Sequence, residues 1–178
     1  MLKNNFFLNK IEICRIICNW HRKDDLTEGR IHGEVSSAME EFYKKYYRLF
    51  ANYAESYWLD TTKLKVTAIK QTWVEYDAWI FVGYKDTGRR KRIINRQKYK
   101  LSTNGYEHLG TSLKHFLFQF NRSTHEVKCA AIGYTDYTDF GLVLDCQQSS
   151  NMCWSTVTCG SIRDNIFKGI TKYVVEKG

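Results

Sequence analysis

The sequence predicts a mainly β protein, in which an antiparallel meander of about seven or eight strands is flanked by helices at both ends. Short runs rich in β-branched and aromatic residues fill the chain from residue 63 to residue 158, and turn residues separate them. Aromatic residues make up 15% of the chain, which suits a β-rich core or a cavity lined by rings. Links of hairpin length between such strands are typical of a barrel or a sandwich.

The length and the charge of the chain limit what it can be. A chain of 178 residues can bury roughly 70% of its unfolded surface, so it can fold without disulfides. Its net charge of +8 is compatible with nucleic acid, an anionic membrane surface or an acidic ligand as partner. No apolar run reaches about 18 residues, so the sequence predicts no transmembrane segment.

The first predicted element covers residues 33–58, as one helix or as a helix that runs into a strand. Apolar side chains recur there at three- and four-residue spacing. Glu41 stands four residues before Lys45, which favours a helical ion pair.

Seven strands are expected next, at residues 63–73, 78–84, 92–101, 112–120, 127–134, 140–146 and 152–158. Turns are expected at residues 86–88, 103–105, 121–123 and 147–150, where Gly, Asn, Asp and Ser gather. A C-terminal helix should begin after Ser161, a suitable N-cap, and bury an apolar stripe from Ile162 to Val174.

A hairpin is the clearest local signal. The strands at 127–134 and 140–146 meet at a short turn of Thr and Asp residues, which we expect to be centred between Tyr137 and Thr138.

This turn, Thr135-Asp136-Tyr137, resembles the second sequence signature of the lipocalins. The Ser-Tyr-Trp tripeptide that ends at Trp58 is similar to their first signature, with serine in the place of glycine. The third signature is an arginine after the last strand, and Thr158 stands where that arginine is expected, with Arg163 nearby.

The resemblance implies an eight-stranded antiparallel barrel over residues 56–178 with a helix on its outside, and leaves residues 1–55 as an N-terminal helical extension. It implies a secreted carrier or scavenger that holds a small apolar or amine ligand in the barrel. A clear signal peptide is not found in residues 1–20, so the expected extracellular location depends on the resemblance.

The ligand candidates come from three expected strands, at residues 63–73, 78–84 and 112–120, and from the short link between the first two. The rings that alternation places in the lining are Trp73, Trp79, Phe81, Phe116 and Phe118. The carboxylates of Glu75 and Asp77 lie near these rings in the sequence and could hold a cationic amine. The alternative is that the rings are ordinary core and the carboxylates lie on the surface.

A basic cluster supports a different function. Its members, within an expected hairpin at residues 89–100, are Arg89, Arg90, Lys91, Arg92 and Arg96. Such a cluster could bind nucleic acid or another polyanion, and the chain would then be an intracellular α+β module. A solvated hairpin with outward basic side chains is the alternative.

The six cysteines leave two interpretations open. An even number favours three disulfides in an oxidising compartment, and six reduced thiols are the alternative. The lipocalin resemblance implies a bridge from Cys146 to Cys14 or Cys18. The expected hairpin register instead places Cys129 opposite Cys146.

Other chemical signals are weak. Asn121 begins a glycosylation sequon in an expected surface loop. Cys14, Cys18 and His21 have the spacing of half a zinc site, but no second half accompanies them. The sequence therefore predicts no metal, no cofactor and no enzyme.

Overall fold

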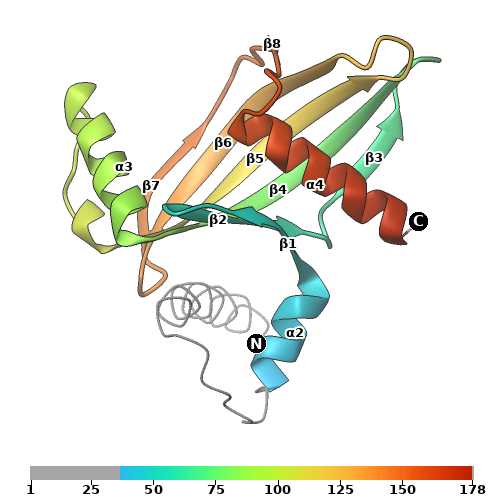
Figure 1. Cartoon of the computed structure of the whole chain (residues 1–178). Coiled ribbons are helices and arrows are strands. Elements are labelled where there is room, and N and C mark those ends of the chain that lie inside the picture. The colour runs from blue at the N-terminus through green and yellow to red at the C-terminus, as the bar shows by residue number, and fades with distance from the viewer. Residues whose placement is uncertain (1–36, 178) are drawn as a thin grey trace.

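Eight strands form one antiparallel sheet in the computed structural model, which describes residues 37–177 (Figure 1). The strands are β1 (Tyr46–Ala51), β2 (Glu55–Asp60), β3 (Lys65–Ala68), β4 (Trp73–Tyr84), β5 (Leu109–Asn121), β6 (Val127–Thr138), β7 (Val143–Gln148) and β8 (Ser155–Thr156). The helices are α2 (Ser37–Lys45), α3 (Asp86–Lys98), α4 (Ile162–Lys177) and the 3-10 turn η1 (Tyr106–His108).

The strand order is β1-β2-β4-β5-β6-β7, while β3 pairs with β4 and β8 pairs with β6. This confirms the predicted mainly β fold, the antiparallel sheet and the C-terminal helix. Within residues 37–177 no pairing joins β1 to β7, so the closed lipocalin-like barrel is not confirmed. Residues 46–55, which the sequence assigns to the extension, supply β1 and the start of β2. Residues 1–36 lie outside the described part of the chain.

The long central strand β4 has two distinct faces because its side chains alternate. One face is almost fully buried, and its members are Val74, Tyr76, Ala78, Ile80 and Val82. We call this the helix face, because α4 packs on it. The opposite side carries the odd-numbered residues of β4, from Trp73 to Phe81, and we call it the outer face.

Helix α4 closes the main core by laying an apolar stripe across the helix face (Figure 1). Ile166, Phe167 and Ile170 are buried there, and the Phe167 ring meets the Tyr76 ring edge-on at 5.5 Å. The predicted N-cap is confirmed, since the Asp164 amide donates a hydrogen bond to the Ser161 hydroxyl at 3.2 Å.

A second, smaller cluster lies on the outer face. Phe42 of α2 packs edge-on against Trp58 of β2. The other buried members of the cluster are Tyr46, Phe81, Leu113 and Tyr137. Because α2 ends at Lys45 and β1 begins at the next residue, the predicted helix that runs into a strand is confirmed.

The predicted turn and strand over residues 86–101 are wrong, because Asp86–Lys98 is helix α3. Gly88, which suggested a turn, lies in the first turn of this helix, where a Cβ atom would come 2.4 Å from the Ala54 carbonyl oxygen. The glycine therefore allows close packing of α3 on the β1–β2 turn. Arg and Lys favour a helix at least as well as a strand, so composition did not decide between them.

The predicted position of the last long hairpin turn is also wrong. Thr135, Asp136 and Tyr137 lie within β6, and the chain reverses over residues 139–142. The Thr138 amide donates to the Leu142 carbonyl, and Gly141 has a φ of 81°, a conformation that glycine adopts without strain.

Two expected strands are also shorter than predicted. Residues 63–73 divide into β3 and the first residue of β4, and within residues 152–158 only the two residues of β8 form a strand.

Candidate ligand pocket

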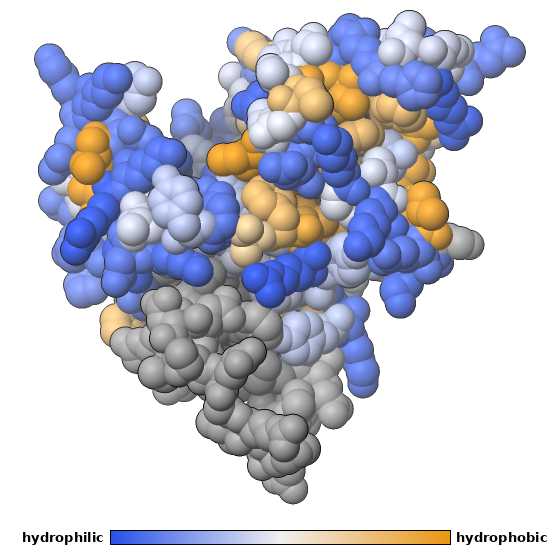
Figure 2. All heavy atoms as spheres, viewed as in Figure 1, coloured by the Kyte–Doolittle hydropathy of each residue, from blue (hydrophilic) through white to orange (hydrophobic). Residues whose placement is uncertain are grey.

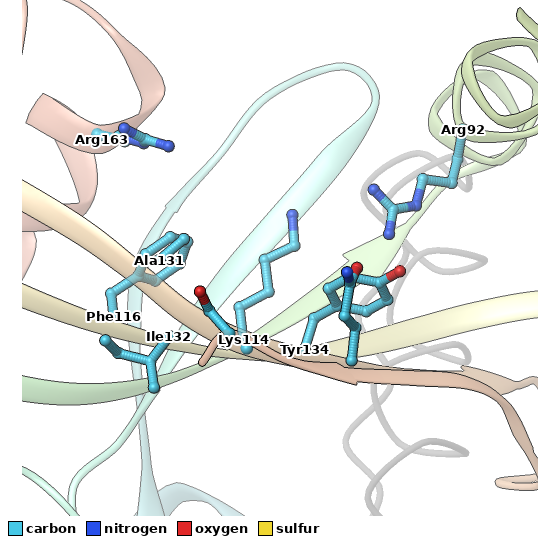
Figure 3. Close-up of a pocket in the computed structure, with 10 residues that line it drawn as sticks. Arg92, Lys114, Phe116, Ala131, Ile132, Tyr134 and Arg163 are labelled. Atoms are coloured by element: carbon cyan, nitrogen blue, oxygen red, sulfur yellow. The ribbon is translucent and has the colours of Figure 1, made fainter. Parts of the chain in front are cut away.

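A pocket of about 410 Å³ lies on the helix face, where α3 and α4 leave the middle of β5, β6 and β7 uncovered (Figure 3). Its lining residues are Arg92, Lys114, Phe116, Ala131, Ile132, Gly133, Tyr134, Gln147, Ser149 and Arg163. A volume of this order lies in the range of pockets that hold small molecules, roughly 300–1,000 Å³.

The apolar part of the pocket is built by β5 and β6. Phe116 pairs with Ala131, and a β-bulge at this point leaves Ile132 as an extra residue of β6. The small side chain of Ala131 is exposed, so nothing fills the space above it. Bulges change the direction of neighbouring side chains, and this one brings successive residues of β6 into the lining.

The charged part comes from three elements. Arg92 projects from α3, Arg163 from α4, and Lys114 rises from β5 between them (Figure 3). Within the described part of the chain, no aspartate or glutamate lines the pocket. The lining therefore has an excess of positive charge.

Arg92 is held by a buried polar network behind the pocket. Its Nη2 donates to Asp136 at 2.9 Å, and the Tyr106 hydroxyl donates to the same carboxylate at 2.7 Å. The Ser112 hydroxyl also donates to Asp136 and lies 3.0 Å from the Tyr84 hydroxyl. Asp136 has no exposed surface, so these partners replace water completely.

Electrostatics raises the pKa values of two members of this network, Arg92 and Tyr106. Burial alone would lower the pKa of Arg92, but the neighbouring Asp136 carboxylate raises this pKa above its usual value. Burial and the hydrogen bond to Asp136 raise the pKa of Tyr106. At neutral pH the arginine is therefore charged and the tyrosine is a donor.

Two further ion pairs flank Arg92 on the same side of α3. Arg89 lies 3.0 Å from Asp139, and Arg96 lies 2.9 Å from Asp145. The spacing of Arg89, Arg92 and Arg96 places all three on one helix face. Three arginines thus fix α3 to the β6–β7 hairpin as one wall of the pocket.

The structure does not bring the predicted ligand residues together. Trp73, Glu75, Asp77, Trp79 and Phe81 lie on the outer face of β4. Phe116 and Phe118 lie on the helix face of β5. Phe116 lines the pocket, whereas Phe118 has no exposed surface and belongs to the core.

The two carboxylates proposed for an amine already have partners on the outer face. Glu75 accepts a hydrogen bond from Gln119 at 2.9 Å, and Asp77 lies 2.7 Å from the His115 Nε2 atom. The His115 ring stacks on Trp79 with centroids 4.2 Å apart. This face is a polar and aromatic surface.

The residues of the lipocalin signatures lie in two strands. Trp58 is buried in β2, and its indole N–H donates to Ser56 at 3.1 Å. Arg48 of β1 lies over this indole ring, 5.8 Å from its centroid, whereas Arg163 lines the pocket on the opposite face. Asp136 is the centre of the buried network, and no sequence argument assigned it that position.

The basic cluster divides into two sets. Arg89, Arg92 and Arg96 pair with aspartates of the hairpin, while Arg90 and Lys91 are exposed. Hydrophilic residues dominate the visible surface of α3, at the left of Figure 2. Only the second set is available to an external polyanion.

The predicted cross-strand bridge between Cys129 and Cys146 is wrong, because Cys129 pairs with Phe118 and Ser155 while Cys146 pairs with Thr135. Four cysteines lie in the described part of the chain: Cys129, Cys146, Cys153 and Cys159, all of them free. Burial raises the pKa of the Cys129 thiol to about 11, so this thiol is protonated at neutral pH. Cys14, Cys18 and His21 lie outside the described residues.

Asn121 ends β5, and its side-chain oxygen accepts a hydrogen bond from the Ser123 amide at 2.9 Å in the following turn.

Among residues 37–177 no three His, Cys, Asp or Glu side chains form a group that could hold a metal ion. No helix in the same range is both long and apolar enough to span a membrane.

Sequence reasoning missed Lys114, Tyr134 and Arg163. The sequence did contain a sign of Lys114. It is a charged residue on the same side of β5 as Phe116 and Phe118, where side-chain alternation predicts an apolar residue. Arg163 was considered only as a residue near the expected position of the third-signature arginine.

Comparisons with protein-family models, with curated proteins and with solved structures found no match to this chain. The lipocalin resemblance therefore stays a prediction.

Proposed function

We propose that this protein binds a small molecule in the pocket between α3, α4 and the helix face of the sheet, as a binding or carrier protein and not as an enzyme. The observation that carries the proposal is an uncovered, ring-lined hollow on a face that is otherwise packed as core. Side chains that fold a protein normally fill such a space, since interiors pack densely.

The shape of the site suits reversible binding. Its floor is apolar, at Phe116 and Ala131, and its polar groups lie at the sides. Small-molecule sites commonly combine an apolar lining with a few polar groups that fix the orientation of the ligand. The barrel, the extracellular location and the carrier role of a lipocalin are further parts of the proposal, and they depend on the resemblance alone.

Substitution Ala131→Trp tests the proposal, because an indole at this position would occupy the floor of the pocket. In a thermal-shift screen of neutral, cationic and anionic aromatic compounds, we expect at least one compound to raise the Tm of the wild type and not that of the variant. A ligand at 100 times its Kd stabilises the folded state by about 2.7 kcal/mol, which is readily measured as a shift in Tm.

Ala51→Trp is the matched control, since Ala51 is exposed at the end of β1 and does not line the pocket. This variant should respond to the same compounds as the wild type. Compounds that stabilise all three proteins equally, or none of them, would contradict binding in the pocket.

A second candidate function is polyanion binding by the exposed side of α3. Arg90, Lys91, Lys98 and Lys100 are exposed on or just after this helix, and no ion pair to any of them is found within residues 37–177. Such a set of free cations is what binding to a phosphate backbone requires.

The double substitution Arg90→Glu with Lys91→Glu should weaken binding to a single-stranded DNA oligonucleotide. Loss of two phosphate contacts should reduce the slope of log K against log salt by about 1.4. Fluorescence anisotropy over a salt series measures this slope, and Lys65→Glu on the remote strand β3 is the control. An unchanged slope in the double variant would exclude α3 as the binding surface.

A further inference from the structure

We infer that the pocket selects an organic anion, a molecule with an aromatic or other apolar body and a carboxylate, sulfonate or phosphate group. This inference rests on the proposed function and names the chemical class of its ligand. It differs from the amine or neutral apolar ligand that the sequence suggests. Four features of the lining carry it.

The first feature is the charge balance. Of the three cations in the lining, Arg92 is neutralised by Asp136. Lys114 and Arg163 have no carboxylate partner among residues 37–177. Two unneutralised cations therefore face the same space, and a bound anion would relieve their repulsion.

The second feature is the position of Lys114. It pairs with Ile80 on one side and with Tyr134 on the other, so it lies on the helix face. Ile80 has no exposed surface, and Ser112 and Phe116, the next residues of β5 on this face, are buried. A lysine at such a half-buried position loses hydration without gaining an ion pair, which is unfavourable for folding. An apolar residue would suit the fold better, so a ligand is the simplest reason for the charge.

The third feature is Arg163, which lies in the first turn of α4. A cation there opposes the helix dipole, whose positive end is at the N-terminus. Its Nη1 atom donates to the Ser155 hydroxyl at 2.8 Å, a neutral acceptor that leaves the charge available. Figure 3 shows that Arg163 and Arg92 lie on opposite sides of Lys114.

The fourth feature is the nature of the remaining lining. Phe116 and Ala131 form an apolar floor beside the cations. The Tyr134 hydroxyl is already committed to Asp145 at 2.8 Å, so this residue offers its ring rather than its hydroxyl. An inorganic anion would leave the floor exposed, whereas an aromatic anion would cover it and reach Lys114.

Two dyes that differ by one charged group test this inference. 8-Anilinonaphthalene-1-sulfonate carries a sulfonate, and N-phenyl-1-naphthylamine has the same rings without it. For the wild type we expect the sulfonate to bind at least about tenfold more tightly, as one charge-assisted hydrogen bond would provide. Fluorescence titration at fixed ionic strength gives both Kd values.

Lys114→Met should remove about tenfold of the affinity for the sulfonate and leave the affinity for the neutral dye unchanged. Lys114→Arg, which retains the charge, should restore sulfonate binding. Lys65→Met is the matched control, because Lys65 is an exposed strand lysine on β3, and it should alter neither Kd. Circular dichroism and the Tm of each variant verify that it is folded.

The outcomes separate the inference from the proposed function. Equal affinity for the two dyes, with both lost in Ala131→Trp and neither changed in Lys114→Met, would overturn the anion selectivity and support a pocket for neutral molecules. Dye binding that Ala131→Trp does not reduce would overturn both. Tight sulfonate binding that needs Ala131 and a charge at position 114 would support both.

Discussion

Replacement of Asp136 by alanine should destabilise the protein more than any other single change among its charged residues. The carboxylate is fully buried and accepts hydrogen bonds from Arg92, Tyr106 and Ser112. Its loss leaves the partly exposed Arg92 without its counter-ion and the buried hydroxyl groups of Tyr106 and Ser112 without this acceptor. We expect the free energy of unfolding to fall by about 3 kcal/mol, measured by urea denaturation.

The matched control is Asp139→Ala, which removes a similar ion pair at the surface. Asp139 is 33% exposed and its partner Arg89 is 23% exposed, so solvent screens their attraction. This variant should lose less than about 1 kcal/mol. Asp136→Asn keeps one acceptor oxygen and should fall between the two. Equal losses for Asp136→Ala and Asp139→Ala would mean that the buried network contributes no more than a surface ion pair.

Local signals in the sequence located most elements of the fold. The cap at Ser161 and the apolar stripe after it predict α4 because both depend on residues close in the chain. Runs of β-branched and aromatic residues likewise predicted the central strands. These features depend on the 3.6-residue and 2-residue periods of side-chain direction, which a sequence displays directly.

The sequence analysis did not predict helix α3, because the contacts that hold this helix in place are made with residues far away in the chain. Arg89, Arg92 and Arg96 read as a solvated or anion-binding cluster until their three aspartates are known. Those aspartates lie more than 40 residues away in the chain. The three- and four-residue spacing of the arginines is compatible with a helix, but it does not show which distant carboxylates they pair with.

The pocket was missed because side-chain alternation within a strand does not give the register between strands. Trp79 pairs with His115, so odd-numbered residues of β4 share a face with odd-numbered residues of β5. The predicted lining combined odd positions of β4 with Phe116 and Phe118, and these two sets lie on opposite faces. Of the residues predicted to contact a ligand, only Phe116 lines the pocket; Arg92, predicted as part of the basic cluster, also lines it.

Phe118→Ala should be the most destabilising change in the apolar core, although the sequence suggested Phe118 as a ligand contact. Its side chain has no exposed surface and its ring lies 5.7 Å from that of Phe167 on α4. Truncation of a buried phenylalanine leaves a cavity, and we expect the free energy of unfolding to fall by about 3–5 kcal/mol in urea denaturation. Trp73→Ala on the outer face, where the ring is only half-buried, should lose clearly less.

A double-mutant cycle separates the loss of the Phe118–Phe167 contact from a general loosening of the core. Because the two rings are in contact, the losses for Phe118→Ala and Phe167→Ala should not add, and the coupling should be about 1 kcal/mol. The pair Trp73 and Phe167, which lie on opposite faces of the sheet, should show additive losses. A coupling near zero for Phe118 and Phe167 would mean that α4 does not rest on β5, and the wall of the pocket that carries Arg163 would lose its support.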